Sequence, residues 1–204
     1  VYVGDLIDSI NKIVLQKRHP IKTNYINNFK VYSLSLQKLE NIIISFKELR
    51  IKKNYDIFKS KLNKKLYSTY VSYFDKKNFF YNTPDHADSR GKFIEFIKSK
   101  SLGQVSFFTI KPSQTRGCHY HHYKTEKFLI TDGEFEVKYQ DISDKKKKFK
   151  KKFDKQKSFI LETMPGYYHE IKNLGKHNLS VLIWSNEVYN PLKHDTYKLE
   201  NEKI

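Results

Sequence analysis

Three histidines and one glutamate stand at spacings that could bring four metal-binding side chains together. His119 and His121 are two residues apart, Glu126 follows after four intervening residues, and His169 lies in a separate segment. In an extended strand, residues two apart share a face, so His119 and His121 are expected to point the same way. Three imidazoles and a carboxylate suit zinc, iron, manganese or nickel. We therefore predict that these four residues bind a divalent metal, with zinc as the first candidate.

Residues near these ligands supply candidates for acid–base chemistry. Lys124 and Lys127 lie in the stretch KTEKF, and Tyr167 and Tyr168 lie in PGYYHE. A buried lysine can lose its proton near neutral pH, whereas a tyrosine at such a position more often packs in the core. We name Lys124, Lys127 and Tyr167 as candidate catalytic residues, and the sequence does not choose between them.

Two further reactive side chains lie beside the histidine pair. His122 and Cys118 alternate to the opposite face of an extended segment. We interpret His122 as a surface residue and Cys118 as a small packed hydrophobe. Because the chain has one cysteine, it has no internal disulfide. This suits a reducing compartment, and we expect a cytoplasmic protein.

A second polar cluster, in the stretch HADSRGKFIEF, could bind an anion. Arg90 offers a forked pair of donors to a diphosphate, and Phe93 offers an aromatic face on the same side of a strand as Glu95. Asp-Ser-Arg-Gly is also ordinary turn chemistry, so the stretch has a purely structural interpretation as well. The predicted substrate-binding residues are Asp88, Arg90, Phe93, Glu95 and Arg116.

The elements that must position these residues fall into two parts. Residues 1–66 are predicted to be rich in helix: residues 5–14 read as a helix start, and apolar residues recur at helical spacing from Leu36 to Leu49 after Ser35, a plausible N-cap. The Lys-rich residues 52–65 read as a connector.

Residues 67–204 are predicted to consist of short strands. Asp-Gly between two apolar stretches predicts a hairpin, and many short strands separated by turns indicate a sandwich or barrel. The predicted strands are residues 67–73, 105–110, 128–130, 135–139, 147–153, 160–163 and 179–184.

Two motifs built on these residues resemble those of the cupin superfamily. HxH(x)4E(x)6G is matched by residues 119–133, and G(x)2H(x)3N by residues 166–173. The first motif usually has a glycine where this chain has Ser113, a departure expected to affect the turn more than the metal. The resemblance implies a mainly β jelly-roll barrel for residues 67–204.

A narrower resemblance points to sugar nucleotides. Residues 88–95 resemble the D-x-R-G-x-F-x-E motif of cupin sugar-nucleotide 3,5-epimerases. Residues 66–198, especially TRGCHYHHYKTEKF and WSNEVYNP, resemble the C-terminal domain of bifunctional capsular-polysaccharide enzymes of the CapF type. This resemblance implies a homodimeric epimerase that acts at C3 of a UDP-2-acetamido-2,6-dideoxy-4-ketohexose. The alternatives are a non-catalytic sugar-nucleotide-binding and dimerisation module for a separate reductase chain, and a metal-dependent oxygenase.

Residues 1–66 are similar to the last elements of the Rossmann-like short-chain reductase domain that precedes the cupin domain in that family. The sequence has no G-x-x-G-x-x-G loop to hold a pyrophosphate and no Tyr-x-x-x-Lys pair in a fitting context. We therefore expect neither NADPH binding nor reduction by this chain.

The formal net charge of +17 comes overwhelmingly from lysine. Base recognition favours arginine, and no nucleic-acid motif accompanies the charge, so we do not expect a nucleic-acid partner. No stretch approaches the roughly 20 apolar residues that span a bilayer, and the sequence shows no signal peptide. We expect no membrane association.

Overall fold

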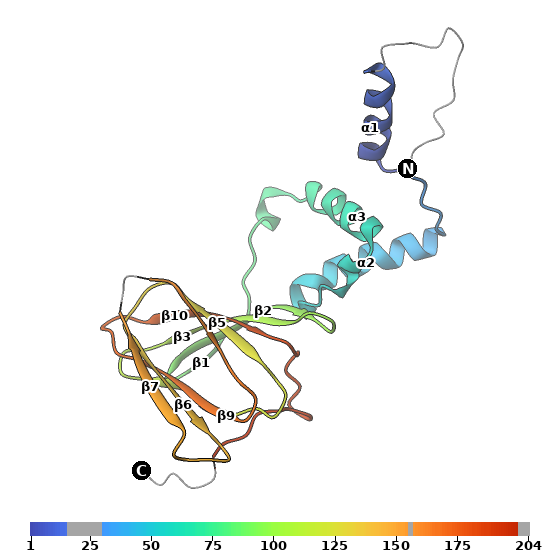
Figure 1. Ribbon diagram of the computed structural model, residues 1–204. Coiled ribbons are helices and arrows are strands. Elements are labelled where there is room, and N and C mark those ends of the chain that lie inside the picture. Colours follow the sequence, from blue (N-terminus) through green and yellow to red (C-terminus); the bar gives the residue numbers. More distant parts are fainter. Residues whose placement is uncertain (16–29, 155–156, 200–204) are drawn as a thin grey trace, which may run out of the picture. The chain divides into compact units, whose positions relative to one another are not determined.

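The computed structural model describes residues 1–15, 30–154 and 157–199 of the chain (Figure 1). These residues form two compact units. One unit comprises residues 1–51 and 57–79, and the other comprises residues 52–56 and those from Phe80 onward.

The first unit is helical. Its helices are α1 (Val3–Val14), α2 (Leu36–Lys52) and α3 (Lys61–Ser72), with short 3-10 turns η1 (Asp56–Lys59) and η2 (Lys76–Asn78). The hydroxyl of Ser35 accepts the Lys38 amide at 3.2 Å, which confirms the predicted cap of α2. Within the described residues, no helix is both long and apolar enough to cross a bilayer.

The predicted connector at residues 52–65 and the strand at residues 67–73 were wrong, because α3 occupies most of this region. Tyr67 and Tyr70 lie three residues apart and both contact the buried ring of Phe46, with centroids 5.2 and 5.6 Å away. This is helical spacing, and the three tyrosines at positions 67, 70 and 73 already follow it in the sequence. Helix α3 runs across residue 66, where the sequence analysis divides the chain, and the first compact unit extends to residue 79.

The second unit is an antiparallel β-barrel of two sheets. The six-stranded sheet has the order β1-β2-β3-β10-β5-β8, and the four-stranded sheet has the order β4-β9-β6-β7 (Figure 1). The strands are β1 (His86–Asp88), β2 (Gly91–Ser99), β3 (Gly103–Ile110), β4 (Thr115–His119), β5 (Glu126–Ile130), β6 (Phe135–Asp141), β7 (Lys148–Phe153), β8 (Phe159–Glu162), β9 (Tyr167–Asn173) and β10 (Leu179–Ser185).

One apolar cluster fills the space between the two sheets. It takes Phe108, Phe128 and Ile183 from the larger sheet and Val137 and Ile171 from the smaller one. Strands with alternating burial such as β3 and β10 place one face in this cluster and the other in solvent. The predicted mainly β jelly roll after a helix-rich part is confirmed, as are the six strands predicted beyond residue 100.

Left-handed backbone conformations bend the chain where β4 meets the site. Gly117 has φ +89° and Cys118 has φ +59°, and the register between β4 and β9 shifts there, which is a β-bulge. A Cβ on Gly117 would lie 2.8 Å from the carbonyl oxygen of His169, so only glycine fits. Ser113, where the motif usually has glycine, adopts φ +64°, so the turn is kept without glycine.

Candidate metal centre

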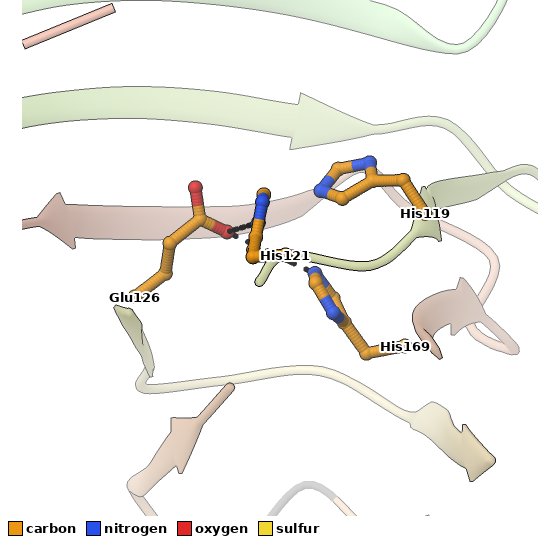
Figure 2. A group of neighbouring side chains, drawn as sticks. All are labelled: His119, His121, Glu126 and His169. Atoms are coloured by element: carbon orange, nitrogen blue, oxygen red, sulfur yellow. Dashed lines mark ion pairs between the residues drawn. The ribbon is translucent and has the colours of Figure 1, made fainter. Parts of the chain in front are cut away.

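His119, His121, Glu126 and His169 converge inside the barrel (Figure 2). One potential ligand atom from each residue lies within 4.8 Å of the others. His119 ends β4, Glu126 begins β5 and His169 lies in β9, so both sheets contribute. Glu126 Oε2 is 3.4 Å from His121 Nε2 and 3.8 Å from His169 Nε2. The sequence prediction that these four residues come together agrees with this geometry.

The backbone fixes which nitrogen of each ring faces the centre. The Nδ1 atoms of His119, His121 and His169 contact the carbonyl oxygens of Gly117, Asp195 and Tyr167, respectively. When Nδ1–H donates to a carbonyl, the lone pair resides on Nε2. All three rings therefore present Nε2 as a potential ligand.

The three Nε2 atoms fit a metal ion. Each is buried and lacks a hydrogen-bond partner among the described residues. Buried polar atoms normally have partners, so three such atoms around one carboxylate need an explanation. Three imidazole nitrogens and one carboxylate match the donors of a divalent transition metal, with zinc among the ions that this set suits.

The protonation states at the centre also favour cation binding. Burial lowers the pKa of His119 to about 4 and that of His169 to about 3, so both rings are neutral at neutral pH. Burial acts to raise the pKa of Glu126, but the His121 ring and the Lys124 ammonium group outweigh it and hold this pKa at about 2. The centre thus combines one negative charge with the neutral rings of His119 and His169.

A cavity of about 490 Å³ opens onto three of these residues, His119, Glu126 and His169. Among the residues predicted from the sequence, it is also lined by Arg90, Phe93, Glu95, Arg116 and Lys124. The structure therefore brings four of the five predicted substrate-binding residues to the same cavity as three of the predicted metal ligands, whereas the sequence placed them in separate motifs.

Two arginines that line the cavity pair with one aspartate outside its lining. Asp88 Oδ2 is 2.6 Å from an Arg90 guanidinium nitrogen, and Asp88 Oδ1 is 3.3 Å from one of Arg116. The hydrogen bonds from Arg90 hold the pKa of Asp88 at about 2. Two cations against one anion leave a net positive charge, although Asp88 itself does not line the cavity.

Phe93 and Glu95 occupy the adjoining wall. Phe93 stacks with Phe108 at a centroid distance of 6.5 Å and an interplanar angle of 15°. The Glu95 carboxylate forms an ion pair with Lys98 at 2.7 Å and accepts a hydrogen bond from Gln104 at 3.3 Å. The wall thus combines an aromatic face with buried polar groups.

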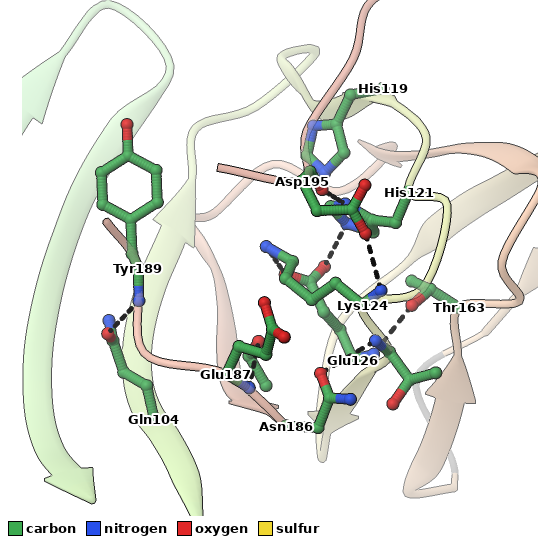
Figure 3. A network of polar contacts seen from close by, with 12 residues as sticks. Gln104, His119, His121, Lys124, Glu126, Thr163, Asn186, Glu187, Tyr189 and Asp195 are labelled. Carbon is green, nitrogen blue, oxygen red and sulfur yellow. Dashed lines mark hydrogen bonds and ion pairs between the residues drawn. The ribbon is translucent and has the colours of Figure 1, made fainter. Parts of the chain in front are cut away.

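Of the three acid–base candidates, one lines the cavity and two do not. Lys124 lines it, with Nζ 2.8 Å from Glu126 Oε1 (Figure 3). Lys127 does not line it: its exposed side chain pairs with Glu162 on the outside of the barrel. Tyr167 does not line it either and packs against the core cluster. We therefore correct the candidate list by removing Lys127 and Tyr167.

Tyr168, His122 and Cys118 lie near the candidate ligands in the sequence but do not line the cavity. The Tyr168 hydroxyl donates to Glu170, and burial raises the pKa of Tyr168. His122 is exposed, as predicted. Cys118 is exposed as well, so its interpretation as a packed hydrophobe was wrong, because the bulge at φ +59° turns it outward.

Residues 186–197, here called the C-terminal strap, contribute to the site in a way that sequence reasoning missed. The Asp195 carboxylate accepts hydrogen bonds from the backbone amides of His122, Tyr123 and Lys124 at 3.0, 2.8 and 2.7 Å. Figure 3 shows Asp195 beside Lys124. Asp195 lies more than 70 residues beyond these amides. No local spacing signals such a contact. The only hint was that the strap belongs to the segment WSNEVYNP and its continuation, which carried the family resemblance.

Comparisons with known proteins agree with this architecture. The model of the family "Polysaccharide biosynthesis C-terminal domain" matches residues 86–197. A curated relative from Pseudomonas aeruginosa, UDP-2-acetamido-2,6-beta-L-arabino-hexul-4-ose reductase, is 35% identical over 197 residues. The match covers 97% of this chain and 52% of the relative.

Solved structures of CapF give the same result. The capsular polysaccharide assembling protein CapF from Staphylococcus aureus is 31% identical, with a TM-score of 0.86 over 98% of this chain and 54% of that one. CapF with the inhibitor 3-isopropenyl-tropolone is 32% identical, with a TM-score of 0.87 over 98% and 57% of the two chains. The chain thus spans about half the length of these relatives.

Proposed function

Because the chain belongs to the polysaccharide biosynthesis C-terminal domain family, in its CapF type, we propose that it epimerises C3 of a UDP-2-acetamido-2,6-dideoxy-4-ketohexose. The Pseudomonas aeruginosa relative is named for a UDP-linked 4-ketose. In such a sugar, C3 is bonded to the ketone carbon and carries an acidic hydrogen. The observation that carries the proposal is one cavity that contains a cation-binding centre, a lysine and an arginine pair.

The proposed metal ligands are His119, His121, Glu126 and His169. A divalent ion held by them would supply Lewis acidity toward a ketone oxygen. The chain's own part is to keep the rings of His119 and His169 neutral and the Glu126 carboxylate charged.

Lys124 is the proposed proton-transfer residue. Of the candidates named from the sequence, it is the one that lines the cavity, and its amino group lies 2.8 Å from Glu126. General acid–base residues must lie within hydrogen-bonding reach of the proton that they move. We propose that Lys124 exchanges a proton with C3 on one face of the sugar.

The arginine pair is the proposed anchor for the UDP diphosphate. Arg90 is partly exposed and Arg116 is largely buried, with side-chain exposures of 46% and 12%. A guanidinium group binds phosphate oxygens through two parallel hydrogen bonds. Phe93, which stacks on Phe108 in the same wall, would pack against the nucleotide.

Hydrogen exchange in deuterated water tests the proposed reaction. The purified chain is incubated with the UDP-4-ketohexosamine, and NMR follows the C3 and C5 proton signals with and without a chelator. The proposal expects loss of the C3 signal that stops when the metal is removed. Because C5 also flanks the ketone, its signal is the internal control for which carbon reacts.

Two lysine variants make the assay specific. Lys124→Met should slow exchange at least about 100-fold, in the range that general acid–base catalysis contributes. Lys127→Met removes an exposed lysine three residues away and should retain the rate. Ligand-induced shifts without exchange in the unmodified, metal-loaded chain would refute the epimerase and leave a sugar-nucleotide-binding module.

A further inference from the structure

His121 differs from the other metal-ligand candidates in what holds it. His119 and His169 pair with each other across β4 and β9, and Glu126 begins β5. His121 lies beyond the end of β4, and only 1% of its surface is exposed. Its position must therefore come from contacts outside the two sheets.

One such contact comes from the Gly166 amide, which donates to the His121 carbonyl oxygen at 2.7 Å. The C-terminal strap supplies the others. Tyr120 and Tyr197 form an isolated antiparallel bridge, with N–O distances of 2.9 and 3.0 Å. The carbonyl oxygen of Asp195 accepts the hydrogen bond of His121 Nδ1. The strap therefore continues the strand pairing of β4 by one residue, Tyr120, and selects the ring nitrogen of His121 that faces the centre.

The side chain of Asp195 fixes the loop that follows. Its carboxylate accepts three consecutive amides, those of residues 122–124, and only 3% of the residue is exposed. Charge-assisted hydrogen bonds to backbone amides are among the stronger ones in proteins. Through one residue, the strap thus holds the ring of His121 and the backbone of Lys124.

The strap also reaches the cavity that would hold the sugar. Glu187, Tyr189 and Thr196 belong to its lining. The amide of Tyr189 donates to Gln104 Oε1 at 3.1 Å, and the Gln104 side chain donates to Ser106 at 2.9 Å (Figure 3). The strap is therefore attached at both ends to walls of the site.

We propose that Asp195 is a positioning residue that acts through His121: it holds the strap against the loop at residues 120–124 so that the fourth ligand is presented to the metal. This inference rests on the metal site of the proposed function. Partners that orient metal ligands typically change metal affinity 10- to 100-fold when removed. The same range is expected here.

A double-mutant cycle on zinc affinity tests the inference in the full chain. Zinc binding is measured by competition with a chromophoric chelator for Asp195→Ala, His121→Ala and the double variant. Asp195→Ala should weaken binding about 10- to 100-fold. In the His121→Ala background, the same change should cost less than about threefold, because residues that act through each other are not additive.

The visible spectrum of bound Co²⁺ tests whether Asp195 acts on metal coordination, because a purely structural role would leave this spectrum unchanged. The visible absorption of the Co²⁺-loaded Asp195→Ala chain should match that of His121→Ala, because both lose the fourth ligand. Asp195→Asn keeps one acceptor oxygen and should lie between Asp195→Ala and the unmodified chain in zinc affinity. Asp144→Ala, which removes a carboxylate that caps a turn without contacting the strap, should change neither property.

Two outcomes would overturn the inference. One is an additive cycle together with an unmodified cobalt spectrum in Asp195→Ala. The other is an unmodified chain that binds no zinc or cobalt at all. If the cycle holds but no C3 exchange is found, the proposed reaction fails while the role of Asp195 stands.

Discussion

Acid should destabilise the metal-free barrel well above the pH at which carboxylates titrate. The pKa values of His119 and His169 are lowered to about 4 and about 3, from 6.5 in an exposed histidine. In the unfolded chain, both rings take up a proton as the pH falls below 6.5, while in the folded chain they stay neutral. The stability that depends on neutral rings is thus complete above pH 6.5 and is lost as the pH falls.

The size of the loss follows from these values. Between pH 7 and pH 5, each histidine costs about 2 kcal/mol of folding free energy, so the pair costs about 4 kcal/mol. With a urea slope of about 2 kcal/mol/M, the unfolding midpoint should fall by about 2 M. Glu126, whose pKa is about 2, adds a further loss only below about pH 4.5.

Urea unfolding followed by Trp184 fluorescence measures this loss. Trp184 is the single tryptophan, lies in β10, and therefore reports the barrel separately from the helical unit. The experiment is run with a chelator at pH 7, 6 and 5. In the variant that combines His119→Asn and His169→Asn, the pH dependence should drop by at least half. An equally steep dependence in that variant would refute the assignment to these two rings.

Two further predictions concern the left-handed residues near the site. Ser113→Gly should stabilise the barrel by about 0.5–1 kcal/mol in the same urea assay. The reason is that a backbone conformation with φ +64° is higher in energy for serine than for glycine. Unchanged or lower stability would contradict this prediction. Gly117→Ala should destabilise the barrel by about 2 kcal/mol, because the added Cβ would press on the carbonyl oxygen of His169. The same change should weaken zinc binding at least about tenfold. An unaltered zinc affinity would contradict this prediction.

The sequence predicted an element best where the spacing of its apolar residues matches the face that they share in the structure. Strand β7, whose KFKKKF stretch also allowed a helical turn, was predicted correctly. Phe149 stacks on Tyr139 and Phe153 stacks on Phe135, with centroids 5.1 and 4.8 Å apart. The aromatics four residues apart share one face of the strand, and the lysines between them remain exposed.

The choice between the two lysines illustrates a signal that was present but not used. Lys127 follows Glu126 directly in β5, so strand alternation alone turns it away from the metal side. Lys124 precedes the strand, and its backbone is set by Asp195. No periodicity predicts the direction of a loop side chain, so its place in the cavity required the structure.

The C-terminal strap makes completion of the centre depend on the order of synthesis. His119, Glu126 and His169 are all translated before the strap, whose contacts with residues 120–124 span more than 70 positions. Contacts of such long sequence separation tend to form late in folding. During synthesis, His119, Glu126 and His169 can therefore come together before the strap positions His121. Metal binding by all four candidate ligands would then require that the strap has been synthesised.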